Sequence, residues 1–218
     1  MTWLLFAFLS ATLLGFYDVF KKRALRDYPV VPVLFLNTFF SSLIFLPFVF
    51  RADVPFGGWE VQRYIVLKSC IVLSSWICGY YGMKHLPLTL VGPINATRPV
   101  MVLLGALLFF GERLNVYQWI GVICAIFSFF LLSRSGKKEG IDFRHNRWIA
   151  CVVMAAVLGA ISGLYDKYLM ASPEAGGVGL NRITVQSYYN CYQCAMMGVM
   201  MMVMKQSLPR PPFSCGVW

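Results

Sequence analysis

Charged residues are scarce in this chain. Only 13% of the 218 residues are Asp, Glu, Lys or Arg, and only nine are acidic, whereas soluble globular domains average about 25% charged residues. Hydrophobic residues make up 59% of the sequence, and the mean hydropathy is +0.67. This composition excludes an ordinary soluble domain and indicates an integral membrane protein that contacts the lipid bilayer.

Residues for metal, redox or nucleic-acid chemistry are also few. The chain has two His residues, and the Cys191-x-x-Cys194 pair has no second ligand pair of the kind that a structural zinc site needs. The seven Cys residues lie mostly inside apolar runs, where Cys packs as a small apolar side chain. The net charge of +10 comes from Lys and Arg scattered between those runs. We therefore expect no metal, no cofactor and no nucleic-acid partner.

Long apolar runs dominate what is present. Residues 86–133 form two such runs joined by a short polar turn at 111–115. The first run, 88–110, contains Arg98 as its one charge, and about 20 apolar residues suffice to cross a hydrocarbon core of roughly 30 Å. A charged residue has a low free-energy cost at the membrane surface and a high one at the membrane centre, so the turn marks an interface. The pattern predicts a membrane helical hairpin.

The whole chain contains seven runs of this kind. They predict an all-α protein with about seven transmembrane helices, at residues 3–20, 30–50, 65–83, 88–110, 116–133, 148–168 and 184–204. The one long hydrophilic segment, 134–147, is basic and separates residues 1–133 from 148–205. Residues 206–218 are too short and too rich in Pro to span a bilayer.

Two short motifs recur at nearly the same offset. Gly15-Phe-Tyr-Asp18 returns as Gly163-Leu-Tyr-Asp166, 148 residues later, and residues 37–40 resemble residues 186–189, 149 residues later. A unit of five helices is odd, so a second copy must enter the membrane from the opposite side. The chain is therefore predicted to be a five-helix repeat followed by the start of an inverted second repeat. Many secondary transporters are built this way, with the substrate site between the repeats.

The central hairpin also resembles a known family. The Pro-rich start of 88–110, the GERL turn at 111–114 and the following QWIG at 118–121 resemble the EamA-type drug/metabolite transporters. The resemblance implies ten helices in two repeats, so the chain looks truncated after the second helix of the second repeat. It also implies a non-enzymatic transporter of small metabolites or drugs that works by alternating access in the bacterial inner (plasma) membrane. The alternative is a fragment that is inactive, or active only as an oligomer.

Ionisable residues inside apolar runs are candidate functional residues, because burial in lipid costs several kcal/mol. Arg98 lies deep in its run and has two readings. In the first interpretation, Arg98 faces a central cavity and attracts an anionic or polar substrate. In the second, it forms a structural pair with Asp18 or a backbone carbonyl. We expect Arg98 to line a substrate cavity together with polar and aromatic side chains of other helices. The predicted lining residues are Arg98, Asn37, Trp76, Tyr80, Gln186 and Tyr189.

The two repeated carboxylates, Asp18 and Asp166, have three readings. At the interface they are solvated helix ends, and if buried they could bind protons or cations in a coupled transport cycle. The two Tyr-Asp pairs also faintly resemble intramembrane aspartyl proteases, in which two carboxylates share a proton. That family has Gly where this chain has Tyr165, and it leaves the GERL turn unexplained.

The orientation in the membrane has two conflicting indications. Loops on one side of the predicted bundle carry twelve Lys and Arg residues, and loops on the other side, with Lys68 included, carry six. The positive-inside rule then places the N-terminus outside the cytoplasm. The family resemblance implies the opposite orientation.

Overall fold

The computed structural model describes every residue except 1, 51–55, 112–114, 137–145 and 207–218. Apart from one short 3-10 helix, η2 (Pro173–Ala175), the regular elements of the described residues are α-helices, which confirms the all-α prediction. They are α1 (Thr2–Asp27), α2 (Val30–Val49), α3 (Gly58–His85), α4 (Leu88–Ala96), α5 (Arg98–Phe110), α6 (Val116–Gly136), α7 (Arg147–Met170) and α8 (Arg182–Val203).

Five stretches of the described chain are long and apolar enough to cross a membrane. They are Leu4–Asp27, Val30–Val49, Gly58–His85, Leu88–Phe109 and Arg147–Met170. The fourth stretch combines α4 and α5, and the seven predicted spans correspond to these five together with α6 and α8. The predicted basic linker, 134–147, and the tail, 206–218, fall mostly outside the described residues.

Two helices are longer than their apolar runs. The first was predicted to end near residue 20, but α1 continues through its basic residues to Asp27, just before Pro29. Lys and Arg are good helix formers, so charge alone does not end a helix. The third begins at Gly58 instead of residue 65, because polar residues such as Gln62 form its first turns. Lys68 therefore lies ten residues inside α3, and it does not belong in the loop charge count.

The predicted helix 88–110 is divided in two at Thr97, between α4 and α5. Pro93 lies inside α4 and Pro99 in the first turn of α5. A proline has no backbone N–H and its ring crowds the preceding turn, so it interrupts a continuous helix but is tolerated at a helix start. The interruption makes Arg98 the first residue of α5.

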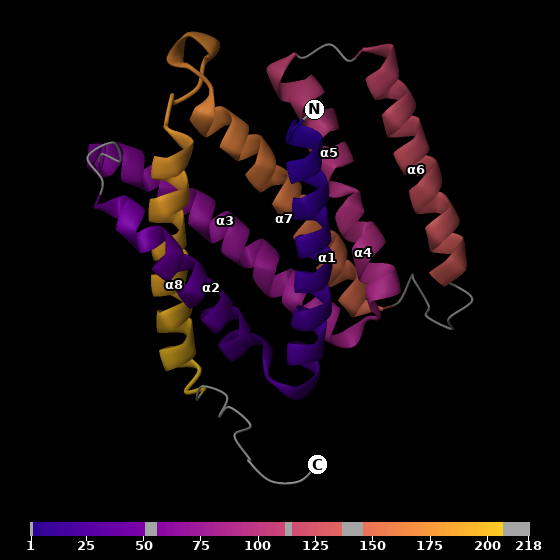
Figure 1. Cartoon of the computed structure of the whole chain (residues 1–218), viewed down its shortest axis with the longest axis horizontal. Helices are drawn as coiled ribbons and strands as arrows, with labels where there is room; N and C mark the ends of the chain where they lie inside the picture. The colour runs from indigo at the N-terminus through magenta and orange to yellow at the C-terminus, as the bar shows by residue number, and fades with distance from the viewer. Residues whose placement is uncertain (1, 51–55, 112–114, 137–145, 207–218) are drawn as a thin grey trace.

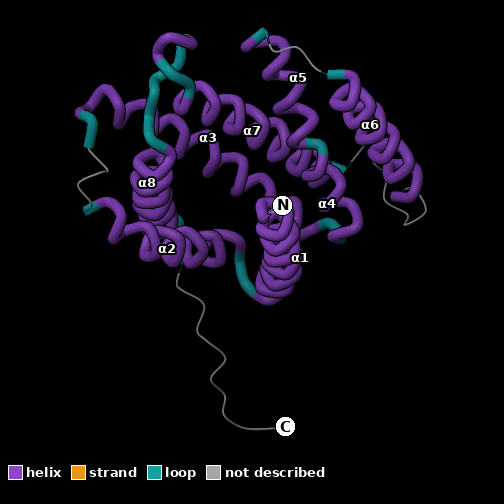
Figure 2. Tube along the Cα trace, turned by 45° about the horizontal axis from the view of Figure 1, so that its top comes forward, coloured by secondary structure: helices purple, strands orange, loops and turns teal. Residues whose placement is uncertain are grey.

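Two pairs of helices form the centre of the bundle. α3 packs along α7, and α2 packs along α8 (Figure 2). At the first contact Gly82 faces Val152, and a Cβ at position 82 would collide with the Val152 side chain. Such small residues let helix backbones approach closely. Leu34, Met83 and Met197 are fully or almost fully buried in the resulting core.

The elements that carry the repeated motifs run in opposite directions. α1 descends from the N-terminus in Figure 1, whereas α7 ascends, and α2 and α8 are likewise antiparallel. The two motif copies thus have the relative direction that an inverted repeat requires.

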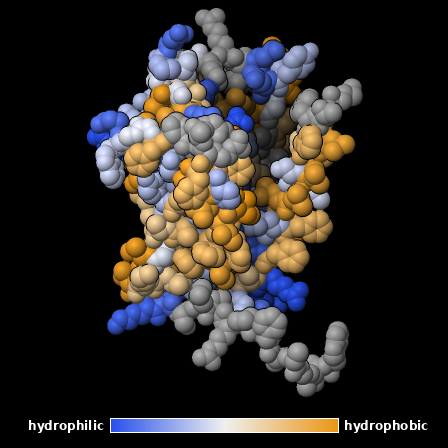
Figure 3. All heavy atoms as spheres, turned by 60° about the vertical axis from the view of Figure 1, so that its left-hand side comes forward, coloured by the Kyte–Doolittle hydropathy of each residue, from blue (hydrophilic) through white to orange (hydrophobic). Residues whose placement is uncertain are grey.

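The outer surface is suited to lipid. α1 alone exposes Leu5, Phe6 and Phe8 by 67, 68 and 73%. On the face shown in Figure 3, apolar side chains cover the middle of the molecule and hydrophilic ones gather toward its two ends. This is the distribution expected of a protein that spans a bilayer.

Candidate functional site

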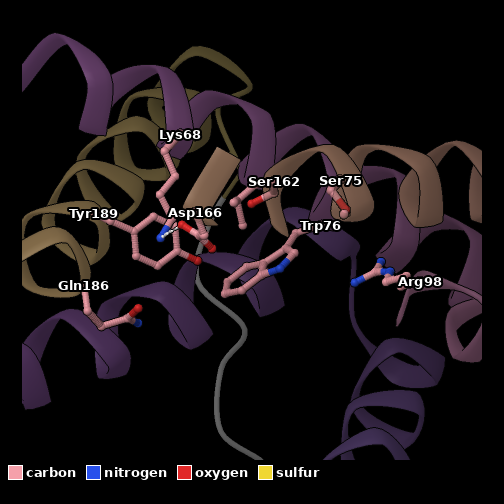
Figure 4. A pocket seen from close by; sticks show the side chains of 10 residues that line it. Lys68, Ser75, Trp76, Arg98, Ser162, Asp166, Gln186 and Tyr189 are labelled. Carbon is pink, nitrogen blue, oxygen red and sulfur yellow. Dashed lines mark ion pairs between the residues drawn. The ribbon is translucent and has the colours of Figure 1, made fainter. Parts of the chain in front are cut away.

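A polar cavity of about 180 Å³ lies between α3, α5, α7 and α8 (Figure 4). α3, α7 and α8 contribute residues at helical spacing, so one face of each of these helices points inward, and α5 contributes its first residue. The lining residues are Lys68, Val72, Ser75 and Trp76 of α3, Arg98 of α5, Gly159, Ser162 and Asp166 of α7, and Gln186 and Tyr189 of α8. Polar groups from four helices thus converge on one space.

One end of the cavity holds a closed ion pair. Lys68 Nζ lies 2.5 Å from Asp166 Oδ1, and the two side chains are 7 and 31% exposed. The same ammonium group lies 4.7 Å from the centre of the Tyr189 ring, a cation–π distance. Because a buried ammonium group is costly without a partner, Asp166 and Tyr189 together account for a lysine in the middle of α3.

The other end holds Arg98. Its Nη2 donates a hydrogen bond to the backbone oxygen of Ala155 at 3.2 Å, and Ser75 Oγ donates to the same oxygen at 2.7 Å. The Arg98 Nε is buried and has no hydrogen-bond partner. The predicted contact with a backbone carbonyl is therefore present, but it uses only part of the guanidinium.

The two ends are separated by an aromatic side chain. Figure 4 shows the Trp76 ring between Arg98 on one side and the Lys68–Asp166 pair on the other. A molecule in the cavity would meet a cationic fork at one end, an ion pair at the other and a flat apolar surface between them. This arrangement suits reversible binding of a small polar molecule.

The structure brings together five of the predicted site residues: Arg98, Trp76, Gln186, Tyr189 and Asp166. The other three, Asn37, Tyr80 and Asp18, do not line this cavity. All three residues belong to helices, but they lie where α1 and α2 meet α3 and not at this cavity. Only tertiary packing separates these two groups of residues.

Asp18 is part of a second cluster beside α1. Its carboxylate lies 2.8 Å from Lys21 Nζ, one turn along the same helix, and it is 37% exposed. The Tyr17 and Tyr80 hydroxyls form a 2.8 Å hydrogen bond next to this pair, and Asn37 interacts with Tyr17. Asp18 is near enough to Arg98 to attract it, but the ion pair that it forms is with Lys21.

The sequence predictions missed five of the lining residues, and Lys68 is the charged one among them. They placed it near a helix start and counted it among loop charges. A signal was available, since Lys68 is a single charge inside the run Ile65–Leu73 and such residues are functional candidates by default.

In the described part of the chain, no group of His, Cys, Asp and Glu is arranged to hold a metal ion.

Comparison with known proteins gives one family. The EamA-like transporter family matches residues 1–134, which is more than half of the chain. No solved structure matches the chain.

Individual relatives cover part of the chain. The uncharacterized transporter YoaV of Bacillus subtilis is 27% identical over 73% of this chain and 55% of its own length. The S-adenosylmethionine uptake transporter of Rickettsia felis is 25% identical over 69% of the chain and 49% of its own length. A probable 4-amino-4-deoxy-L-arabinose-phosphoundecaprenol flippase subunit ArnE of Aeromonas salmonicida is 32% identical over 35% of the chain. The chain spans about half the length of the first two relatives.

Proposed function

Because this chain belongs to the EamA-like transporter family, we propose that it is a membrane transporter that moves small molecules by alternating access through the cavity between α3, α5, α7 and α8. The observation that carries the proposal is the cavity itself. Lys68, Arg98 and Asp166 gather in it although the surrounding helices are apolar. Charged side chains are expensive at that depth and mark substrate or ion pathways.

The arrangement of the repeats supports this mechanism. α3 and α5 belong to the first predicted repeat, and α7 and α8 belong to the second, so both repeats contribute to the cavity wall. Transporters with inverted repeats bind substrate at the repeat interface and rock one repeat against the other. In this chain such a motion would change which end of the cavity is open.

Of the two repeated carboxylates, Asp166 is the better candidate for coupling transport to a proton or cation. It lines the cavity and holds Lys68, so neutralising Asp166 would free the ammonium group to meet a substrate. Asp18 is paired within its own helix, next to α1's apolar exposed surface. Since each carboxylate has its own lysine, the structure gives no support to a protease in which the two share a proton.

An oligomeric form is a second candidate, and the exposure of α1 favours it. α7 is covered by α3 and α5, whereas α1 makes few contacts and exposes most of its apolar side chains. The ArnE relative is named as a flippase subunit. A second chain could therefore cover α1. For either form, the bacterial relatives favour the bacterial inner membrane.

The proposal is tested by blocking the cavity. Cells that express the chain are compared with empty-vector cells for the distribution of small metabolites between cells and medium. Ser162→Trp fills the cavity from α7, and Ser74→Trp adds the same bulk to an exposed position of α3. We expect expression to redistribute particular metabolites, Ser162→Trp to abolish this change, and Ser74→Trp to retain it at equal abundance.

Two results would contradict the proposal. One is an unchanged metabolite distribution when the chain is inserted in the membrane at normal abundance. The other is a redistribution that Ser162→Trp and Gln186→Trp, both inserted normally, leave intact. If the protein cleaves peptide bonds in detergent and the cleavage needs both Asp18 and Asp166, the protein is an intramembrane aspartyl protease and the transport proposal is wrong.

A further inference from the structure

We propose that the cavity binds the anionic group of a compact organic molecule, a carboxylate or a phosphate, and that Arg98 is the residue that holds it. This inference rests on the proposed function and names the substrate class of the same cavity.

The charges of the cavity lead to this class. Three side chains that line it belong to charged residue types: Lys68 and Arg98 are basic, and Asp166 is acidic. Lys68 and Asp166 compensate each other across 2.5 Å. Asp18, the acidic residue that attracts Arg98, already forms an ion pair with Lys21. One positive charge is left over inside an apolar bundle, and a ligand with one negative charge would balance it.

The hydrogen bonds of Arg98 show which donors remain for a ligand. Nη2 is directed to the Ala155 oxygen, which also accepts from Ser75. The Nε is buried without an acceptor. A guanidinium has five N–H donors in a planar fork that matches two oxygens of a carboxylate or phosphate. Arg98 is thus anchored at one corner and has donors left for an anion.

Gly159 holds the guanidinium in place. A Cβ at position 159 would lie 2.8 Å from both Cζ and Nε of Arg98, too close for a real contact. The planar group therefore lies directly on the backbone of α7, in space that is open because residue 159 has no side chain. Gly159 acts through Arg98 and is a positioning residue.

The size and the remaining wall restrict the rest of the molecule. A volume of about 180 Å³ is below the roughly 300–1,000 Å³ of pockets for drug-sized ligands. Trp76 lies beside Arg98 in the direction of the Lys68–Asp166 pair, as Figure 4 shows. A ligand that places its anionic group on Arg98 would lay a short, flat body against Trp76.

The test uses the full chain in nanodiscs of phosphatidylcholine, with binding measured by isothermal titration calorimetry. The probes are benzoate and phenyl phosphate, with neutral benzamide and cationic benzylamine as isosteric controls. We expect benzoate or phenyl phosphate to bind and benzamide to bind roughly tenfold more weakly or not at all. Arg98→Gln should weaken anion binding by roughly ten- to a hundredfold. Arg98→Lys, which keeps the charge but loses the planar fork, should bind anions with an affinity between those of Arg98→Gln and the unaltered protein. Arg23→Gln, an exposed arginine of α1, should bind like the unaltered protein.

Gly159→Ala tests the geometry without removing the charge. The added methyl should displace the guanidinium and lower the affinity for benzoate relative to benzamide. Gly15→Ala is the matched control, because no side chain or neighbouring atom lies within 4 Å of a Cβ there. A merely structural role for Gly159 would lower thermal stability but leave the ratio of the two affinities unchanged.

A further arm distinguishes two sources of the anion. Phosphatidylglycerol in the nanodisc that displaces phenyl phosphate in an Arg98-dependent way identifies a lipid headgroup, and failure to displace it identifies a water-soluble ligand. The inference is overturned if neither anion binds, if Arg98→Gln binds anions as before, or if benzamide or benzylamine binds more tightly. In each of these cases a metabolite redistribution that is sensitive to Ser162→Trp would leave the transport proposal standing.

Discussion

The Gly-x-Tyr-Asp sequence of α1 and its copy in α7 reach α3 in similar ways. The Tyr17 hydroxyl forms a hydrogen bond with the Tyr80 hydroxyl at 2.8 Å, and the Tyr165 hydroxyl donates to the Tyr64 backbone oxygen at 3.3 Å. One helix therefore receives the tyrosine of both copies, near its two ends. This contact is what the repeated motif has in common.

The neighbours of the glycine and the aspartate differ between the two copies. A Cβ at Gly15 would meet nothing within 4 Å, whereas one at Gly163 would lie 3.0 Å from Val102 of α5. Asp18 pairs with a lysine of its own helix, whereas Asp166 pairs with the buried Lys68 of α3. Asp166 therefore lines the cavity and Asp18 does not, because α7 packs against both α3 and α5, whereas α1 packs lightly against α2 and α3.

The largest effect that separates the two copies should come from the aspartates. Asp166→Asn leaves the Lys68 ammonium buried without its carboxylate, and we expect it to lower the free energy of unfolding by about 3 kcal/mol. Asp18→Asn removes a pair within one helix whose carboxylate is 37% exposed, and it should change the free energy of unfolding by less than about 1 kcal/mol. Equilibrium unfolding in mixed micelles measures both.

The double variant Lys68→Met with Asp166→Leu is the control for this prediction. It removes both charges, so it should recover much of the stability that Asp166→Asn loses. Equal losses for Asp18→Asn and Asp166→Asn would show that the two copies do not differ in the way described.

The glycines should give the next largest difference. Gly163→Leu inserts a side chain into the contact between α7 and Val102 of α5, and such overpacking costs about 1–3 kcal/mol. Gly15→Leu adds the same side chain to an open position and should be neutral, or slightly stabilising because Leu is the better helix former. Thermal unfolding of the two purified variants in one detergent measures this difference. A loss of stability in Gly15→Leu would mean that a partner covers that face of α1.

The smallest expected effect concerns the ends of the two helices. Lys22 of α1 donates hydrogen bonds from Nζ to the backbone oxygens of Met83 and Leu86, which lie at the end of α3. The corresponding residue of α7 is Met170, which has no donor. Lys22→Met should lower the free energy of unfolding by about 1–2 kcal/mol, and Met170→Lys should not raise it comparably. Both are measured by micelle unfolding, and an unchanged Lys22→Met would show that water replaces these bonds.

Sequence patterns predicted most of the helices because membrane insertion depends on local composition. A long run of apolar residues favours a helix in lipid, because a helix satisfies its backbone N–H and C=O groups within the segment. The errors fall where polar residues continue a helix, as at the end of α1 and the start of α3. The break at Thr97 was missed although Pro93 and Pro99 flank it, because hydropathy alone does not show a proline break.

The sequence by itself determined that Arg98 and Trp76 lie inside apolar runs, and that the chain repeats a motif that contains Asp18 and Asp166. It did not determine which of these residues share a space. Asn37, Tyr80 and Asp18 have the same sequence signature as the cavity residues but lie elsewhere. Tertiary packing also decided the partner of Lys68, because an ion pair between α3 and α7 depends on the rotation of two helices about their axes. That rotation is fixed by close contacts such as Gly82 against Val152, and no pattern within one helix specifies it.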